Sequence, residues 1–113
     1  MRHVLLLLAF LISGAISQPV YAYQDALYHV MTSDSISLYV HVKGEGPMCL
    51  YLHGGPGSGS SWIEAVSGHM LEKRFTMVYL DQRGVCKSET PKNDDFSFAR
   101  QIQDWEEVAG TRH

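Results

Sequence analysis

The sequence lacks the features of several common classes of protein. Nine Lys and Arg residues against twelve Asp and Glu give a net charge of -3, so there is no basic stripe of the kind that binds nucleic acid. The longest apolar run, Val4–Ile12, is shorter than the roughly 20 residues that a membrane-spanning helix requires. Nucleic-acid binding and a stable membrane span are therefore not predicted.

Patterns for phosphate, metal and disulfide sites are also missing. Neither glycine signature of a nucleotide-binding loop occurs, because Ser60 stands where the third glycine of one would be. His29, His41 and His53 are evenly spaced but belong to separate predicted strands, without a Cys or carboxylate pattern that suggests a metal. Cys49 and Cys86 could lie near each other if their strands are neighbours, but spacing alone cannot show disulfide geometry, so two free thiols are favoured over a pair.

The first 22 residues have the organisation of a signal peptide. Arg2 and His3 precede the apolar run, and Val20-Tyr21-Ala22 places small or medium residues at the -3 and -1 positions of a cleavage site. We expect cleavage after Ala22 and export to the periplasm, the cell surface or the medium, with an uncleaved anchor as the alternative. Residues 23–113 would then form one partial domain.

The rest of the chain alternates between strand and helix patterns. The expected elements are, in order, strands over 27–31, 36–42 and 48–52, a helix from Ser60 or Ser61 to about Lys73, a strand over 75–80, and a helix from Ser97 through Val108. The first two strands form an antiparallel hairpin. The third and the fourth, joined by a helix, form a right-handed parallel crossover. Five apolar residues of the connecting helix are expected to face inward: Trp62, Ile63, Val66, Met70 and Leu71.

One glycine-rich segment, residues 53–59, stands out at the end of the third strand. The apolar run 48–52 ends in His53-Gly54-Gly55-Pro56-Gly57, where three glycines let backbone N–H groups face a ligand and Pro56 stiffens the path. Such a loop can stabilise an anion, as an oxyanion hole does in acyl-transferring hydrolases. The alternative is an ordinary glycine-rich turn.

Two motifs together resemble one enzyme family. His53-Gly54-Gly55-Pro56-Gly57 and the later segment Asp81-Gln82-Arg83-Gly84 are similar to the HGGPG and DQRG-x-G-x-S signatures of proline iminopeptidases, which are α/β-hydrolases. The resemblance implies an α/β fold: the N-terminal part of an α/β-hydrolase, with strands 1–4 and the first helices, truncated before the nucleophile elbow. It runs from about residue 28 to 108, only about the first third of such an enzyme.

The resemblance also implies roles for individual residues. Gly55 would donate a backbone N–H to the oxyanion, while His53, Gly54, Pro56 and Gly57 would shape the loop. The later motif is interpreted as a structural turn: Asp81 and Arg83 would be joined by charge-assisted hydrogen bonds, with Gln82 between them and Gly84 supplying an unusual backbone angle. Cys86 stands where the family has a second glycine, so that turn is expected to be stiffer or displaced.

The attacking group is missing from the sequence. No serine lies in a G-x-S-x-G nucleophile elbow, and the family's Asp and His would lie beyond residue 113. The complete enzyme would release N-terminal proline from a peptide with a free N-terminus, without metal or cofactor. We expect this chain alone to be inactive, and residues 109–113 suggest a truncated product or a partial gene model. The alternatives are part of another α/β-hydrolase, such as an epoxide hydrolase or esterase, or a non-catalytic remnant.

Overall fold

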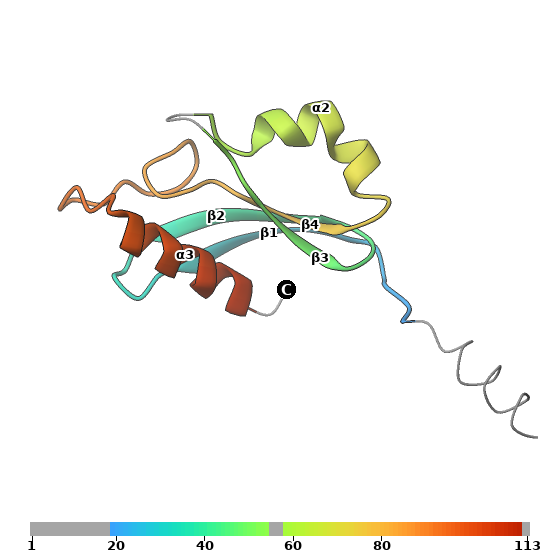
Figure 1. Cartoon of the computed structure of the whole chain (residues 1–113), viewed down its shortest axis with the longest axis horizontal. Coiled ribbons are helices and arrows are strands. Elements are labelled where there is room, and N and C mark those ends of the chain that lie inside the picture. The colour runs from blue at the N-terminus through green and yellow to red at the C-terminus, as the bar shows by residue number, and fades with distance from the viewer. Residues whose placement is uncertain (1–18, 55–57, 112–113) are drawn as a thin grey trace, which may run out of the picture.

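A computed structural model describes residues 19–54 and 58–111 of the chain. These form a four-stranded sheet with a helix on each face (Figure 1). The elements are β1 (Gln24–Met31), β2 (Ser37–Gly44), β3 (Met48–Leu52), α2 (Ser61–Leu71), β4 (Thr76–Leu80) and α3 (Phe98–Gly110). The strand order is β1-β2-β4-β3, so β3 lies at one edge.

The predicted hairpin is confirmed. Strands β1 and β2 are antiparallel, with Gln24 opposite Gly44 and Met31 opposite Ser37. Both strands are longer than expected. Residues 24–26 continue the pairing of β1, and Lys43 and Gly44 extend β2 until it meets the start of β4. Successive residues of β2 alternate between half-buried and buried because neighbouring side chains point to opposite faces of the sheet.

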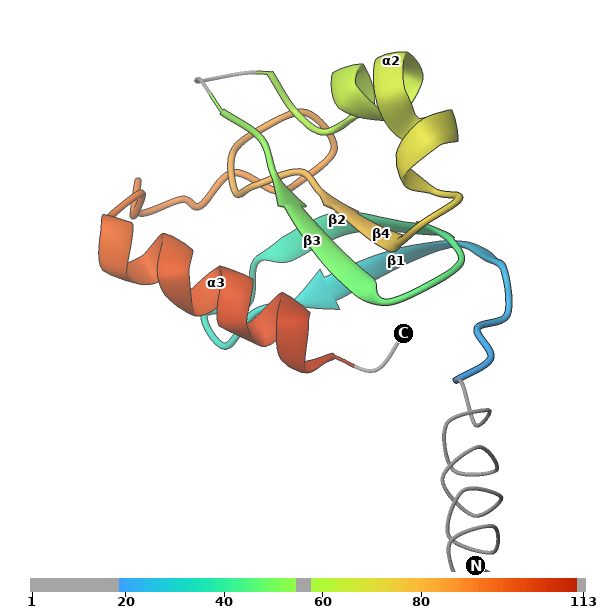
Figure 2. The same cartoon turned by 45° about the vertical axis from the view of Figure 1, so that its right-hand side comes forward.

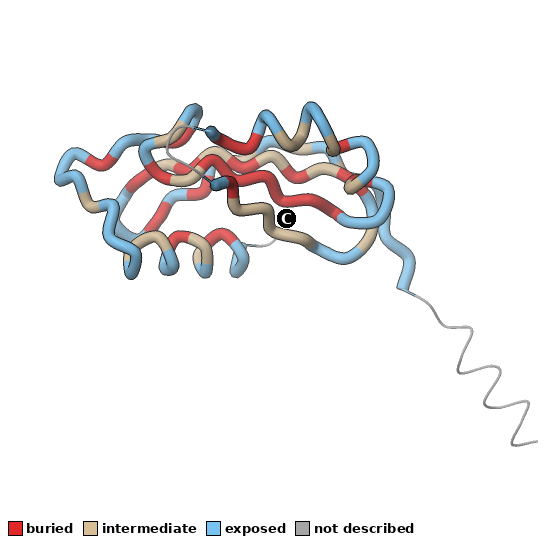
Figure 3. Tube along the Cα trace, turned by 45° about the horizontal axis from the view of Figure 1, so that its top comes forward, coloured by how far each residue is buried: buried red, intermediate tan, exposed pale blue. Residues whose placement is uncertain are grey.

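The crossover from β3 through α2 to β4 is also confirmed. Strands β3 and β4 are parallel, with Met48 beside Thr76 and Leu52 beside Leu80. Strand β4 lies between β2 and β3, and all five of its residues are buried. A parallel strand with both faces covered has a nearly continuous apolar sequence, and this pattern is why the strand could be predicted. Figure 3 shows the buried centre of the sheet and its exposed margins.

The predicted inward face of α2 is wrong for its largest members. Trp62, Val66 and Met70 are exposed, with 64%, 54% and 63% of their surface accessible. The helix instead meets the sheet at Gly68, where an added Cβ would lie 2.6 Å from the Glu72 carboxylate and 3.2 Å from the Tyr79 hydroxyl. The absence of a side chain at Gly68 therefore lets α2 lie close to β4, and the bulky apolar stripe points outward.

Helix α3 begins where predicted and covers the opposite face of the sheet (Figures 1 and 2). Ser97 caps it by accepting a hydrogen bond from the Arg100 backbone N–H. Val108 is fully buried and Trp105 packs against the same core, whereas Ala99 and Ile102 are exposed. The core between α3 and the sheet contains eight buried residues: Val30, Ile36, Leu38, Val40, Val42, Val78, Leu80 and Val108.

Candidate active site

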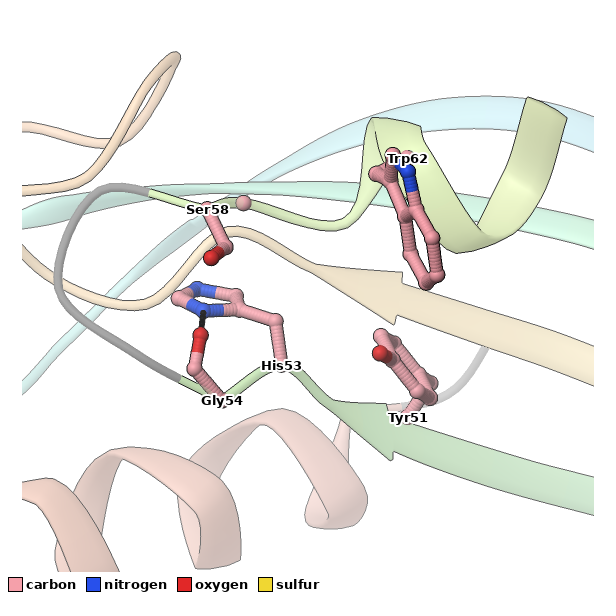
Figure 4. Close-up of a pocket in the computed structure, with 6 residues that line it drawn as sticks. Tyr51, His53, Gly54, Ser58 and Trp62 are labelled. Carbon is pink, nitrogen blue, oxygen red and sulfur yellow. Dashed lines mark hydrogen bonds between the residues drawn. The ribbon is translucent and has the colours of Figure 1, made fainter. Parts of the chain in front are cut away.

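The candidate site lies where β3 and β4 end side by side. Because the strands are parallel and Leu52 is beside Leu80, His53 emerges next to Asp81. An open pocket of about 450 Å³ lies at this point, lined by Tyr51, His53, Gly54, Ser58, Gly59 and Trp62. In Figure 4, Tyr51 and Trp62 extend toward each other from β3 and α2, and the His53 ring lies between Gly54 and Ser58. The pocket thus combines backbone from the glycine-rich segment with an aromatic wall.

His53 is held from both its ring and its carbonyl group. Its Nε2 accepts the Gln82 backbone N–H at 3.0 Å, and its carbonyl accepts the Gln82 side-chain N–H at 2.7 Å. An acceptor at Nε2 places the ring proton of neutral His53 on Nδ1, which lies 3.4 Å from the Gly54 carbonyl oxygen. These two bonds join the ends of β3 and β4. Because His53 is also buried, its ring has little freedom to turn.

Only part of the glycine-rich segment belongs to the described structure. Gly54 is exposed, and a Cβ added there would have no atom within 4 Å. The side-chain position of Gly54 is therefore open. Gly55, Pro56 and Gly57, to which the resemblance assigns the oxyanion N–H and part of the loop shape, lie outside the described residues.

Asp81 anchors the chain where it returns from the glycine-rich segment. Its carboxylate accepts hydrogen bonds from the Ser60 N–H at 2.8 Å and from the Ser60 hydroxyl at 2.9 Å, and one from the Lys87 N–H at 3.3 Å. Ser60 is the N-cap residue of α2 and has a helical backbone (φ -90°, ψ -20°), and its hydroxyl donates to Asp81 and makes no capping hydrogen bond to the helix. Asp81 is buried, so these bonds fix the start of α2 relative to the end of β4.

The predicted joining of Asp81 to Arg83 is wrong. Arg83 turns away and binds two other carboxylates, with Nε 2.6 Å and Nη2 2.9 Å from Asp104 oxygens and both Nη atoms 3.0 Å from Asp34 oxygens. The side chains of Arg83 and Asp104 are 1% and 3% exposed. A planar guanidinium bound on two edges ties α3 and the turn between β1 and β2 to the segment after β4.

These contacts shift the pKa values of the groups involved. Burial alone would lower the pKa of Arg83, but its hydrogen bonds to Asp104 and Asp34 raise it. The hydrogen bond from Arg83 lowers the pKa of Asp34 from 3.8 to about 2, against a smaller opposing effect of desolvation. On the other face, burial and the hydrogen bond to Glu72 raise the pKa of Tyr79, so it stays a neutral donor. Arg83 and Asp34 are thus both ionised at neutral pH.

The Asp34 shift predicts an acid-dependent loss of stability. Because the folded-state pKa lies below the ordinary value of 3.8, ionised Asp34 stabilises the fold above about pH 4, and this stabilisation is lost as the pH falls toward 2. Asp34→Asn should therefore be less stable than the natural chain at pH 6, with the difference shrinking between pH 4 and pH 2. Urea unfolding at several pH values measures this, with Asp94→Asn as the exposed control. Parallel stability curves for the natural chain and Asp34→Asn would contradict it.

The turn after β4 contains two residues with positive φ. Gly84 has φ +74°, and an added Cβ there would lie 2.5 Å from the Phe96 ring, so both backbone and packing require glycine. Cys86 has φ +45°, which is uncommon for a residue with a side chain. The turn thus keeps a left-handed backbone at the position where the resembling enzymes have glycine. Cys49 and Cys86 are not joined by a disulfide.

The described residues contain neither a cluster of metal ligands nor a helix that could span a membrane. No group of three or more His, Cys, Asp or Glu side chains in residues 19–54 and 58–111 could hold a metal ion. No helix in the same ranges has the length and apolar character needed to cross a membrane.

Comparison with known proteins identifies the family. The family model described as the alpha/beta hydrolase fold matches residues 47–109, more than half of the chain. The chain belongs to this family. The match covers β3 to nearly the end of α3, so it includes the residues that line the pocket and the Arg83–Asp104 pair, whereas Asp34 lies before it. The predicted fold class is therefore confirmed: these residues form part of an α/β-hydrolase fold.

Solved structures of hydrolases are similar to the chain. An esterase from Exiguobacterium antarcticum is 26% identical, with a TM-score of 0.63 over 71% of this chain and 29% of the esterase. E-2-(acetamidomethylene)succinate hydrolase is 28% identical, with a TM-score of 0.63 over 75% of this chain and 30% of that one. A protein assigned as an epoxide hydrolase, from Pseudomonas aeruginosa, is 28% identical, with a TM-score of 0.58 over 83% and 30%. None of the curated proteins matches significantly.

The chain spans about three-tenths of the length of these three hydrolases. The family assignment supports a hydrolase in general terms. It does not extend to one substrate, because the three similar structures carry different activities in their descriptions.

Several contacts of the site are not predicted by the sequence analysis. Asp104 and Asp34 hold Arg83, and the Trp105 indole N–H donates to the Gln82 side chain at 3.3 Å. A signal for Asp104 was present, because Arg100 and Asp104 are four residues apart and pair on one face of α3. No local pattern points to Asp34 or to the Trp105 contact, since both depend on how distant segments pack.

Proposed function

We propose that this chain is the part of a serine α/β-hydrolase that supplies the oxyanion loop, and that the complete enzyme releases N-terminal proline from peptides. The observation that carries the proposal is the contact between its two motifs. Gln82 of the second motif binds both the ring and the carbonyl group of His53 in the first. Motifs that are 29 residues apart thus meet beside one open pocket.

The proposed chemistry uses backbone donors rather than a metal. A serine supplied by another segment attacks the carbonyl of the peptide, with a histidine as general base, and negative charge develops on the carbonyl oxygen. The Gly55 N–H donates to that oxygen, and one such donor stabilises the transition state by about 3 kcal/mol. Asp81 and Gln82 hold the two ends of the loop, through Ser60 and His53. The substrate is a peptide with a free N-terminus.

Ester hydrolysis is the second candidate function. The esterase from Exiguobacterium antarcticum is similar over 71% of this chain, and an ester passes through the same kind of oxyanion. The HGGPG and DQRG motifs favour the peptidase, because the resemblance to proline iminopeptidases rests on both.

The test requires a complete enzyme, made by joining this segment to the remainder of an α/β-hydrolase that bears a nucleophile. The product is offered a prolyl-arylamide and a simple aryl ester, and kcat/KM is measured for each. We expect preference for the prolyl-arylamide. Preference for the ester would overturn the aminopeptidase assignment and favour the second candidate.

Export completes the proposal. Residues 1–22 are proposed to be a signal peptide cleaved after Ala22, which places the enzyme in the periplasm, at the cell surface or in the medium. Its partner there is the peptide substrate, and neither nucleic acid nor cofactor is part of the proposal. N-terminal sequencing of the exported product tests it: we expect a product that begins at Tyr23, and one that begins before Tyr23 would contradict it.

A further inference from the structure

The side-chain amide of Gln82 is bonded at both of its ends. Its Nε2 donates to the His53 carbonyl oxygen at 2.7 Å, and its Oε1 accepts from the Trp105 indole nitrogen at 3.3 Å. A carbonyl oxygen can only accept and an indole N–H can only donate, so the orientation of the amide is unambiguous. The contacts form a chain from α3 through the segment after β4 to the end of β3.

Among the described residues, the segment that receives these bonds has one further side-chain contact, between His53 Nδ1 and the Gly54 carbonyl oxygen at 3.4 Å. Beyond the last pair of β3 and β4, Leu52 with Leu80, the chain leaves the sheet through His53. Gly54 has no side chain to pack, and a Cβ added there would have no atom within 4 Å. The direction of the chain at Gly54 is therefore set at His53, where Gln82 holds the carbonyl group and the ring together.

We infer that Gln82 is a positioning residue for the oxyanion loop and that Trp105 orients it from helix α3. Trp105 keeps the amide of Gln82 turned toward the His53 carbonyl, and that bond sets the direction in which the chain enters the loop. The functional meaning of this positioning rests on the proposed function above, whereas the contacts themselves do not. Helix α3 thereby contributes to loop geometry without lining the pocket.

The test uses nuclear magnetic resonance of the ¹⁵N-labelled full chain at neutral pH, without substrate. The readouts are the two ring nitrogens of His53 and the backbone amide of Gly54. In the natural chain we expect one state of neutral His53 with the proton on Nδ1. Trp105→Phe removes the indole N–H together with part of the ring system, and keeps an aromatic ring beside Phe98, whose ring centroid lies 6.1 Å from that of Trp105. Gln82→Glu keeps an acceptor for Trp105 but places a carboxylate against the His53 carbonyl.

Both variants should shift the Gly54 amide signal, while the His53 tautomer, which is held by the backbone N–H of Gln82, should stay the same. The matched control is Glu106→Gln, on an exposed position next to Trp105, which should change neither signal. An unchanged Gly54 amide signal in folded Trp105→Phe would overturn the inference. Loss of the helical circular dichroism of Trp105→Phe would also overturn it, because the residue would then stabilise the whole domain rather than position one loop.

The Trp105→Phe result decides the matter even if Gln82→Glu fails to fold. The outcome is also separable from that of the proposed function. The expected shifts together with a complete enzyme that prefers aryl esters would keep the positioning role and reject the aminopeptidase. Absent shifts together with preference for the prolyl-arylamide would reject the positioning role and keep the aminopeptidase.

Discussion

Arg83→Met is expected to lower the free energy of unfolding by about 3–5 kcal/mol, the usual cost of removing one partner from a buried ion pair. Asp104 is 3% exposed and would lose two hydrogen bonds from Arg83, of 2.6 and 2.9 Å, while keeping only its contacts with Arg100. Asp34 would lose its bonds from Arg83 in the same step. One substitution therefore loosens the ties among α3, the β1–β2 turn and the segment after β4.

Urea unfolding measures this effect, with Arg74→Met as the control. Arg74 is exposed in the turn after α2, and a surface substitution of this kind usually changes stability by less than about 0.5 kcal/mol. The double variant Arg83→Met with Asp104→Leu should lose less than the sum of the two single variants, because it leaves no buried unpaired carboxylate at residue 104. Equal losses for Arg83→Met and Arg74→Met would show that the buried pair does not hold the fold together.

Gly44→Ala should cost at least about 3 kcal/mol, because it combines backbone strain with a clash. Gly44 ends β2 with φ +118°, a conformation that residues with side chains rarely adopt. A Cβ there would lie 2.3 Å from the Phe75 carbonyl oxygen and 2.7 Å from that of Glu72, both in the backbone just before β4. The crossover from α2 to β4 passes so close to β2 that neither side can move without breaking the pairing of Gly44 with Thr76.

Gly110→Ala is the matched control for that substitution. Gly110 is the last residue of α3, and a Cβ there would have no atom within 4 Å. Alanine in a helix is more stable than glycine by roughly 0.5–1 kcal/mol, so this variant should be equal to or slightly more stable than the natural chain. Thermal unfolding of the two variants side by side tests the pair, and a Gly44→Ala variant as stable as Gly110→Ala would contradict the close approach.

The order and type of the strands and helices could be predicted from the sequence, because local patterns carry that information. The buried run 76–80 and the alternating residues of β2 each reflect how many faces of a strand are covered. The inward face of α2 could not be predicted in the same way. Apolar periodicity indicated Trp62, Val66 and Met70, but the helix approaches the sheet through Gly68, a residue without a side chain to signal burial.

The candidate site was only partly predictable for a related reason. The glycine-rich loop and the DQRG segment are local motifs, and the parallel crossover implied that both end at the same edge of the sheet. The partners of Arg83 are not local. Asp34 lies 49 residues earlier and Asp104 lies 21 residues later, so the shorter-range pairing with Asp81 seemed favourable until the packing of α3 was known. The Trp105 contact with Gln82 depends on the same packing.

The central claim is that this chain contributes an oxyanion loop but no attacking group. Treatment of the folded full chain with a fluorophosphonate, which reacts covalently with activated serines, followed by mass spectrometry, tests it most directly. The account predicts an unmodified chain, because none of its serines lies in a nucleophile elbow. A phosphonylated serine anywhere in the 113 residues would contradict it.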